Sequence, residues 1–202
     1  VRDPRISLIA FTGSKAVGLD IIGAAGVVPG HQPHVKKVVC EMGGKNAIII
    51  DASADLDEAV LGVRQSAFGF SGQKCSACSR VVVVDSAHDT FLERLVESTK
   101  TLHVGDPREP GTDVGPVIDQ EAANKIRSFI KIGAEEGKLE CTSEVSAALE
   151  EKVGKPFVGP TVVSGISPDD RLATEEIFGP VLAVIRVADF DEAIRVANMT
   201  DY

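Results

Sequence analysis

The feature of this 202-residue sequence that most constrains its fold is an alternation of short apolar runs with longer amphipathic segments. The four consecutive valines at 81–84 are typical of a strand that is buried on both faces, as strands of a parallel sheet are. Parallel strands need long connections, which the amphipathic segments can supply as helices. The sequence therefore predicts an α/β fold with a largely parallel sheet, whose other strands are expected at 6–11, 35–40, 47–50 and 181–187 and within 157–163.

Helices are expected where apolar residues recur at helical spacing behind a residue suited to cap them. Ser86 and Asp89 resemble a capping box, so Ser86 is expected to cap the helix that buries Phe91. The segment 138–155 is polar and weakly patterned, and it is expected to be surface with no regular element assigned to it. The other helices are expected after Ser14, after Ser53 or Asp55, after Asp119 and over 190–197.

The charge of the chain argues against two classes of partner. Thirty acidic against 21 basic residues give a formal net charge of −9 at pH 7. Nucleic acids and anionic membranes attract a basic surface, so neither is an expected partner. No apolar run approaches the roughly 18 residues of a membrane span, and no leader peptide is visible, so we expect a cytoplasmic protein.

The four cysteines point to a reduced protein with one thiol of interest. Cys75 and Cys78 form a lone Cys-x-x-Cys, without the further ligands at suitable spacing that a zinc site needs, so no metal is expected. A redox-active pair of Cys75 and Cys78 is an alternative. Cys40 and Cys141 are expected to be inert.

Three short segments carry residues suited to chemistry, and the first is Phe11-Thr12-Gly13-Ser14. It lies at a predicted strand-to-helix turn, where backbone N–H groups and the Ser14 hydroxyl suit a phosphate. An ordinary helix cap is the alternative. The Gly-x-Gly-x-x-Gly fingerprint of a standard Rossmann turn is absent.

The second segment is Glu41-Met42-Gly43-Gly44-Lys45-Asn46. Glu41 ends an apolar strand, and ligands of open α/β sheets bind where strands end. The two glycines would let a ligand or another backbone approach closely. A partly desolvated carboxylate in that position can act as a general base, although a surface glutamate before a turn has the same pattern.

The third segment runs from Gly72 to Arg80 and contains Cys75. This thiol follows a glycine-containing turn, beside Lys74 and near Arg80. Nearby cations favour the thiolate, which is the nucleophilic form of cysteine. An unreactive core cysteine is the alternative interpretation.

Taken together and in this order, these segments resemble the NAD(P)-dependent aldehyde dehydrogenase superfamily. The resemblance spans essentially the whole chain, and it implies the three-layer α/β sandwich of that family. The matching motifs are Phe-Thr-Gly-Ser at 11–14, Glu-Met-Gly-Gly-Lys at 41–45, Gly-Gln-Lys-Cys at 72–75, Val-Gly-Asp-Pro at 104–107, Gly-Pro-Val-Ile at 115–118, Gly-Pro-Thr-Val at 159–162 and Glu-Glu-Ile-Phe-Gly-Pro-Val at 175–181.

The resemblance implies two catalytic residues. Cys75 would attack the aldehyde carbonyl as a thiolate, with its own backbone N–H forming half of an oxyanion hole. Loss of a hydride to the nicotinamide would leave a thioester on Cys75. Glu41 would then activate the water that hydrolyses this thioester.

The resemblance also implies residues that hold the NAD cofactor. Ser14, with Gly13 before it, would contact the pyrophosphate. Glu176 would accept hydrogen bonds from the ribose on the nicotinamide side, and Phe178 would pack near the nicotinamide. The sequence does not separate a preference for NAD from one for NADP.

Within the superfamily, the block 70–80 looks like that of the Δ1-pyrroline-5-carboxylate dehydrogenases, as do 13–19 and the stretch before Val35. Those enzymes oxidise L-glutamate γ-semialdehyde to L-glutamate in proline catabolism, and the resemblance places Phe70 and Ser76 at the aldehyde substrate. The same block occurs in the C-terminal half of bifunctional proline utilization A proteins, which are fused to a proline dehydrogenase domain. Another aldehyde dehydrogenase, such as a succinate semialdehyde type, and the thiol redox module are the alternatives.

The resemblance finally divides the chain into two parts. Residues 1–43 would be the C-terminal piece of a Rossmann-type NAD-binding domain, and residues 44–202 an incomplete catalytic domain. Because the catalytic unit of the family is much longer, the chain is expected to be a fragment without NAD-dependent turnover of its own. The full protein is expected to be a homo-oligomer.

Overall fold

The computed structural model describes all 202 residues, which divide into two compact units, unit 1 at Val1–Gly44 and unit 2 at Lys45–Tyr202. The domain boundary expected from the sequence was one residue earlier, after residue 43. None of the helices in either unit has the length and apolar character needed to cross a membrane.

Unit 1 is a single strand–helix–strand crossover. Strand β1 (Leu8–Thr12) leads into helix α1 (Lys15–Gly26), and the chain returns to strand β2 (Lys37–Glu41). The two strands are parallel, with Thr12 opposite Glu41 at their carboxyl ends. Ser14 caps α1, because its Oγ accepts a hydrogen bond from the Val17 N–H at 3.4 Å. Both expected strands and the expected helix are therefore present, with ends shifted by one or two residues.

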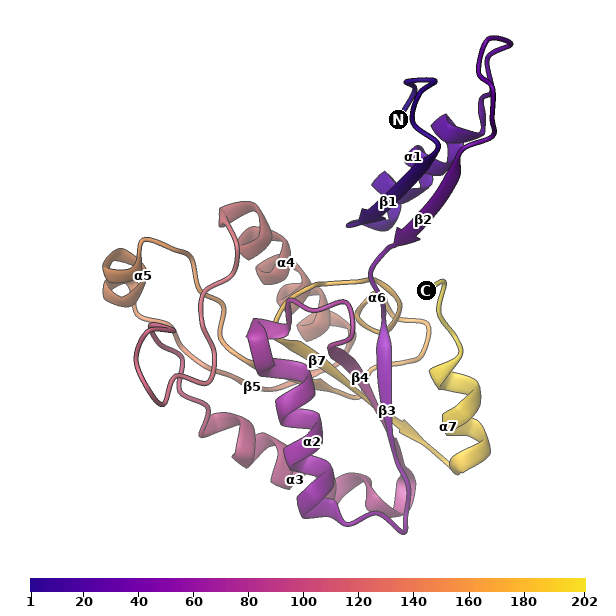
Figure 1. Ribbon diagram of the computed structural model, residues 1–202. Helices are drawn as coiled ribbons and strands as arrows, with labels where there is room; N and C mark the ends of the chain where they lie inside the picture. The colour runs from indigo at the N-terminus through magenta and orange to yellow at the C-terminus, as the bar shows by residue number, and fades with distance from the viewer. The chain divides into compact units, whose positions relative to one another are not determined.

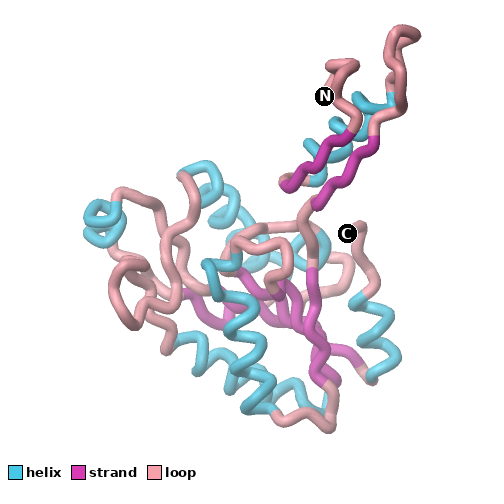
Figure 2. The backbone as a smooth tube through the Cα atoms, viewed as in Figure 1, coloured by secondary structure: helices cyan, strands magenta, loops and turns pink.

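Unit 2 is built on a five-stranded sheet (Figure 2). The strands lie in the order β3–β4–β7–β6–β5, and all neighbours are parallel except β5, which is antiparallel to β6. The sheet is thus largely parallel, as the sequence predicted, with one antiparallel strand at its edge. The bounds are β3 (Asn46–Ile50), β4 (Cys78–Val84), β5 (Lys138–Thr142), β6 (Thr161–Ser164) and β7 (Val181–Val187).

Helices cover both faces of this sheet, with α2 and α3 on one face and α4 and α7 on the other (Figure 1). This explains why the valines of β4 are all fully or almost fully buried. Asp55 caps α2 and Asp119 caps α4, as expected. The helices are α2 (Leu56–Phe68), the short 3₁₀ helix η1 (Gly69–Gly72), α3 (Asp85–Lys100), α4 (Gln120–Glu136), α5 (Ala147–Val153), α6 (Arg171–Thr174) and α7 (Phe190–Ala197).

One expectation about these elements was wrong, and one segment expected at the surface forms elements that the sequence did not predict. Helix α3 begins at Asp85, directly after β4 ends at Val84, so Ser86 lies inside its first turn and makes no cap. The segment 138–155, to which no element was assigned, forms β5 and α5. Strand β5 is polar because it is the edge of the sheet, and its regularity comes from pairing with β6 and not from its own pattern.

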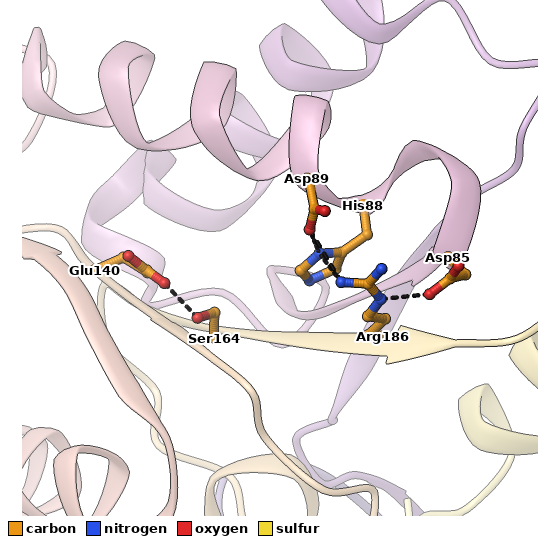
Figure 3. A network of polar contacts seen from close by, with 6 residues as sticks. All are labelled: Asp85, His88, Asp89, Glu140, Ser164 and Arg186. Carbon is orange, nitrogen blue, oxygen red and sulfur yellow. Dashed lines mark hydrogen bonds and ion pairs between the residues drawn. The ribbon is translucent and has the colours of Figure 1, made fainter.

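The carboxyl edge of the sheet is closed by a polar network (Figure 3). Arg186 of β7 donates to Asp85 at 2.5 Å and to Asp89 at 3.0 Å, both in the first turns of α3. The Nδ1 of His88 lies 2.8 Å from the same Asp89 carboxylate. These contacts fix the start of α3 over the end of β7. None of the residues that the sequence singled out for chemistry belongs to this network.

Candidate active site

The candidate catalytic residues of unit 2 gather at the amino edge of its sheet. Strands β3, β4 and β7 are parallel neighbours, so their amino ends lie side by side. Cys75 lies in the turn that precedes β4, and Glu176 and Phe178 lie in the loop that precedes β7. The fold thus brings these three residues to one edge of the sheet from segments about a hundred positions apart, as the residue numbers show.

The turn that carries Cys75 is exposed, and its backbone is held on two sides. The Ala77 N–H donates to the Lys74 carbonyl at 3.1 Å, which closes the turn. The side-chain amide of Asn46, at the start of β3, donates to the Cys75 carbonyl at 2.7 Å. Because the backbone is fixed while the thiol is accessible, Cys75 is presented as a nucleophile should be.

The residues just before this turn adopt an uncommon backbone. Phe70, Ser71 and Gly72 all have left-handed φ values, of 57°, 57° and 66°. Two non-glycine residues in succession in this region cost free energy, which the surroundings must supply. Part of that support is the Ser71 Oγ, which donates to the Gly115 carbonyl at 2.9 Å.

Gln73 attaches the same loop to the segment between α3 and α4. Its amide oxygen accepts from the Ile118 N–H at 3.0 Å, and its amide nitrogen donates to the Pro116 carbonyl at 3.4 Å. An open hollow of about 360 Å³ lies between the two segments, and Cys75 is not in its lining. Phe70, which was assigned to the substrate, does line it, together with Ser71, Gln73, Pro107, Thr112, Asp113, Gly115 and Pro116.

The loop before β7 touches the loop before Cys75. A Cβ at Gly72 would lie 2.3 Å from the Gly179 carbonyl oxygen, so the two backbones meet where no side chain fits. Phe178 is the third non-glycine residue with a left-handed φ, of 59°, and 43% of its surface is exposed. The Glu176 carbonyl accepts from the Lys125 Nζ of α4 at 2.9 Å, which fixes the loop from the other side.

Cys78 is buried, whereas Cys75 is exposed. It is only 3% exposed, and its thiol donates to the Arg80 carbonyl at 3.2 Å. Burial raises the pKa of Cys78 to about 12, so the thiolate that disulfide exchange requires is absent near neutral pH. All four cysteines are free thiols. These observations weigh against a redox pair of Cys75 and Cys78.

Unit 1 holds the other three predicted site residues, Gly13, Ser14 and Glu41. They lie together at the carboxyl ends of β1 and β2, where the Gly13 N–H donates to the Glu41 carbonyl at 3.0 Å. The carboxylate of Glu41 is exposed. Ser14 acts as a helix cap, which was one of its two interpretations, and its contact with a cofactor phosphate stays a prediction.

Sequence reasoning gave no role to Lys45, Asn46 or Gln73, although all three stand inside motifs it had identified. Lys45 is the most unusual of them, since it is 2% exposed and its Nζ has no hydrogen-bond partner. Burial, and to a lesser extent the charge of Arg80, lower the pKa of Lys45 from 10.5 to about 7. Its position after two glycines was visible in the sequence, but its burial was not.

We expect the substitution Lys45→Met to stabilise the chain, and to do so more at pH 7 than at pH 10. Between pH 7 and 10.5 the unfolded chain holds a proton on Lys45 that the folded chain releases. The free energy of unfolding therefore rises with pH in this window, by up to about 1.4 kcal/mol per unit. Met cannot titrate, so the excess of the variant's free energy of unfolding over that of the unmodified chain should shrink by about 3 kcal/mol between pH 7 and 10.

Urea unfolding of the 202-residue chain at both pH values measures this difference. Lys131→Met, at an exposed position of α4, is the control for simple loss of a lysine. If Lys45→Met stabilised the chain equally at pH 7 and pH 10, this result would contradict the lowered pKa of Lys45.

Comparison with known proteins agrees with the motifs. The chain matches the model of the aldehyde dehydrogenase family over residues 1–202. It is 48% identical over 202 residues to the 1-pyrroline-5-carboxylate dehydrogenase of Geobacillus kaustophilus. The aligned residues cover 100% of the chain and 38% of that enzyme. The chain therefore spans well under half the length of the curated relatives it matches.

Two solved structures have the same fold over the whole chain. Proline utilization A from Bdellovibrio bacteriovorus superposes with a TM-score of 0.94 at 48% identity, with 20% of that protein covered. The 1-pyrroline-5-carboxylate dehydrogenase from Thermus with bound NAD superposes with a TM-score of 0.92 at 46% identity, with 38% covered. The chain therefore shares its fold and the order of its motifs with both of these proteins over all 202 residues.

Proposed function

The chain belongs to the aldehyde dehydrogenase family, and we propose that it is the nucleophile-bearing segment of a longer NAD-dependent enzyme that oxidises L-glutamate γ-semialdehyde to L-glutamate. The observation that carries this proposal is the exposed Cys75, on a turn held by Asn46 and packed beside the loop of Glu176 and Phe178. The substrate is supported by relatives at 46–48% identity that are named 1-pyrroline-5-carboxylate dehydrogenases.

In the proposed reaction Cys75 and Glu41 act in turn. The Cys75 thiolate forms a C–S bond to the aldehyde carbon, and the carbonyl oxygen becomes an alkoxide that the Cys75 N–H stabilises. Departure of a hydride from that carbon leaves a thioester. Glu41 takes a proton from water, the hydroxide attacks the thioester, and the C–S bond breaks to release L-glutamate and the thiolate.

The residues present fit a dinucleotide cofactor. Ser14, with Gly13 directly before it, offers its backbone N–H and its hydroxyl at the amino end of α1, where a pyrophosphate is favourably held. Glu176 offers a carboxylate for ribose hydroxyls, and the exposed ring of Phe178 offers an apolar surface for the nicotinamide. Bound NAD would supply the hydride acceptor. Ser76 and Phe70 would contact the substrate.

The proposal extends to the whole protein that contains this segment. Residues 1–43 would complete a Rossmann-type NAD domain, and residues 44–202 would belong to the catalytic domain. A cytoplasmic location agrees with four free thiols, and fusion to a proline dehydrogenase domain agrees with the proline utilization A match. The homo-oligomer expected from the family is part of the same proposal.

A full-length enzyme containing this segment is expected to prefer L-glutamate γ-semialdehyde over succinate semialdehyde by at least about tenfold in kcat/KM. Buried polar groups that bind a substrate amine or carboxylate are left unpaired by an analogue that lacks it, and this produces such ratios. The measurement is NADH formation with each aldehyde. The 202-residue chain is the matched control, and it is expected to give no NADH with either substrate.

Equal kcat/KM for the two aldehydes would favour the succinate semialdehyde alternative. Turnover by the 202-residue chain itself would contradict the proposal that further segments are needed. Thiol–disulfide exchange by Cys75 and Cys78 without dehydrogenase activity would replace the proposal with the redox module.

A further inference from the structure

The turn of Cys75 is held from strand β3 by a single side chain. Residues 74–77 form this turn, which closes where the Ala77 N–H donates to the Lys74 carbonyl at 3.1 Å. The side-chain amide of Asn46 donates to the Cys75 carbonyl at 2.7 Å and to the Ala77 carbonyl at 3.4 Å. No other element makes a hydrogen bond with Cys75 or Ser76. Asn46 therefore sets where the turn lies against the sheet.

An irregularity in the sheet lies at Asn46. This residue pairs with Cys78 of β4, but the next residue, Ala47, pairs with Arg80, so Ser79 has no partner on β3. The Ser79 hydroxyl instead donates to the Asn46 carbonyl at 3.3 Å. A bulge of this kind changes the direction of the side chains beside it, and bulges are common next to active sites. The side chain of Asn46 can therefore reach the segment before β4.

The two acceptors fit an amide and not a carboxylate at position 46. Both groups that the Asn46 side chain meets are backbone carbonyl oxygens, which can only accept hydrogen bonds. The amide nitrogen carries two N–H donors and can serve both oxygens. An ionised carboxylate of nearly the same shape has no donor. Asparagine and aspartate are therefore similar in size at this position and opposite in their effect on the turn.

The bond that closes the turn leaves the Cys75 N–H free. A peptide group is planar and trans, so its carbonyl and its N–H point in opposite directions. The Lys74 carbonyl accepts from the Ala77 N–H, and the Cys75 N–H of the same peptide makes no hydrogen bond within the protein. This N–H is the group proposed to stabilise the alkoxide. Its direction follows the orientation of the turn, which Asn46 holds.

We propose that Asn46 is a positioning residue for the nucleophile, which holds the thiol and the N–H of Cys75 in one orientation toward the aldehyde. This inference rests on the proposed function and adds a residue to it. Asn46 acts through the backbone of the turn and touches neither the substrate nor the cofactor. A displacement of about 1 Å can cost on the order of a hundredfold in rate, so loss of this contact should slow the attack of Cys75 on a carbonyl carbon.

The test uses a full-length enzyme that contains this segment, with Asn46→Ala, Asn46→Asp and the control Ser79→Ala. The measurement is the rate constant for acylation of Cys75 by an activated ester, followed in the first turnover without cofactor. Asn46→Ala removes both bonds to the turn and should lower this rate constant by at least about tenfold. Asn46→Asp should lower it further, because its carboxylate would face two carbonyl oxygens. Ser79→Ala removes only the bond to the Asn46 carbonyl and should stay within about twofold of the unmodified enzyme.

Two further measurements separate positioning from a general structural role. Alkylation of Cys75 by iodoacetamide needs the thiolate but no N–H donor, so its rate in Asn46→Ala should stay within about threefold of the unmodified enzyme. The Kd for NAD should be unchanged in this variant, because Asn46 acts on the turn and not on the residues proposed to bind the cofactor. Asn46 is exposed, so its truncation leaves no cavity in the core.

Three results would overturn the inference. The first is a loss of less than about tenfold in the acylation rate of Asn46→Ala, or a smaller loss in Asn46→Asp than in Asn46→Ala. The second is a parallel loss of acylation, alkylation and NAD binding in Asn46→Ala, which would mean a structural role. The third is an equal loss in Ser79→Ala, which would assign the effect to the bulge. An unmodified enzyme that is acylated by the ester but oxidises no aldehyde contradicts the proposed function itself, and the comparison of the variants is unaffected.

Discussion

Replacing Cys75 by alanine in a full-length enzyme that contains this segment is expected to abolish dehydrogenase and esterase activity together. Both reactions begin with attack of the same thiolate on a carbonyl carbon, so both should fall by at least about 10³-fold. The fold should be unaffected, because Cys75 is exposed in a turn whose hydrogen bonds use only its backbone. NADH formation and hydrolysis of an activated ester, measured on one preparation, give the result.

Cys78→Ser is the matched control for Cys75→Ala. Its hydroxyl can keep the hydrogen bond to the Arg80 carbonyl, and a buried thiol with a pKa near 12 makes no contribution as a nucleophile. Activity within a few-fold of the unmodified enzyme is therefore expected. Retained ester hydrolysis in Cys75→Ala would identify another nucleophile. Loss of activity in Cys78→Ser, with its fold intact, would revive the redox pair.

Gly72→Ala is expected to cause the largest loss of stability of any single methyl added to unit 2 near the site. Its new Cβ would lie 2.3 Å from the Gly179 oxygen and 2.5 Å from the Gly179 carbon, and neither backbone atom can rotate away. The φ of 66° adds a cost of its own for alanine. Together these effects should lower the free energy of unfolding by about 3 kcal/mol or more.

Gly154→Ala separates the two contributions to this loss. Gly154 has a φ of 70° and ends α5, but a Cβ there would meet nothing within 4 Å. It should cost only about 1 kcal/mol, the price of a left-handed alanine. Urea unfolding of the 202-residue chain compares the two variants. Equal losses would mean that the Gly72–Gly179 contact relaxes freely and does not hold the two loops together.

The strongly patterned elements could be predicted from the sequence, because the spacing of their own apolar residues indicates which of their faces are buried. The valines of β4 predict a buried strand, and the apolar face of α4 predicts an amphipathic helix, whatever their neighbours in the fold are. Strand β5 could not be predicted in this way, since it is exposed along much of its length and exists through its ladder with β6. The cap of α3 was misplaced because β4 passes into the helix without a linker.

The roles of the candidate site residues stay predictions, and the contacts that support these residues could not be predicted from the sequence. Motifs located Cys75, Glu176 and Phe178, and the fold brought these three to one edge of a sheet. The contact of Asn46 with the Cys75 carbonyl and the burial of Lys45 depend on which strands become neighbours. A single sequence does not state strand order, so no local pattern could have predicted either feature.

The two edges of the sheet in unit 2 differ in the length of the connecting segments that lie there. At the carboxyl edge, α3 follows β4 directly and only residues 188–189 separate β7 from α7. The amino edge carries 101–119, the turn of Cys75 and the loop 175–180. Insertions or loop exchanges at the amino edge leave every strand register intact, whereas at the other edge they would displace a helix. The loops at the amino edge can therefore change in length and sequence while the sheet that carries them stays the same.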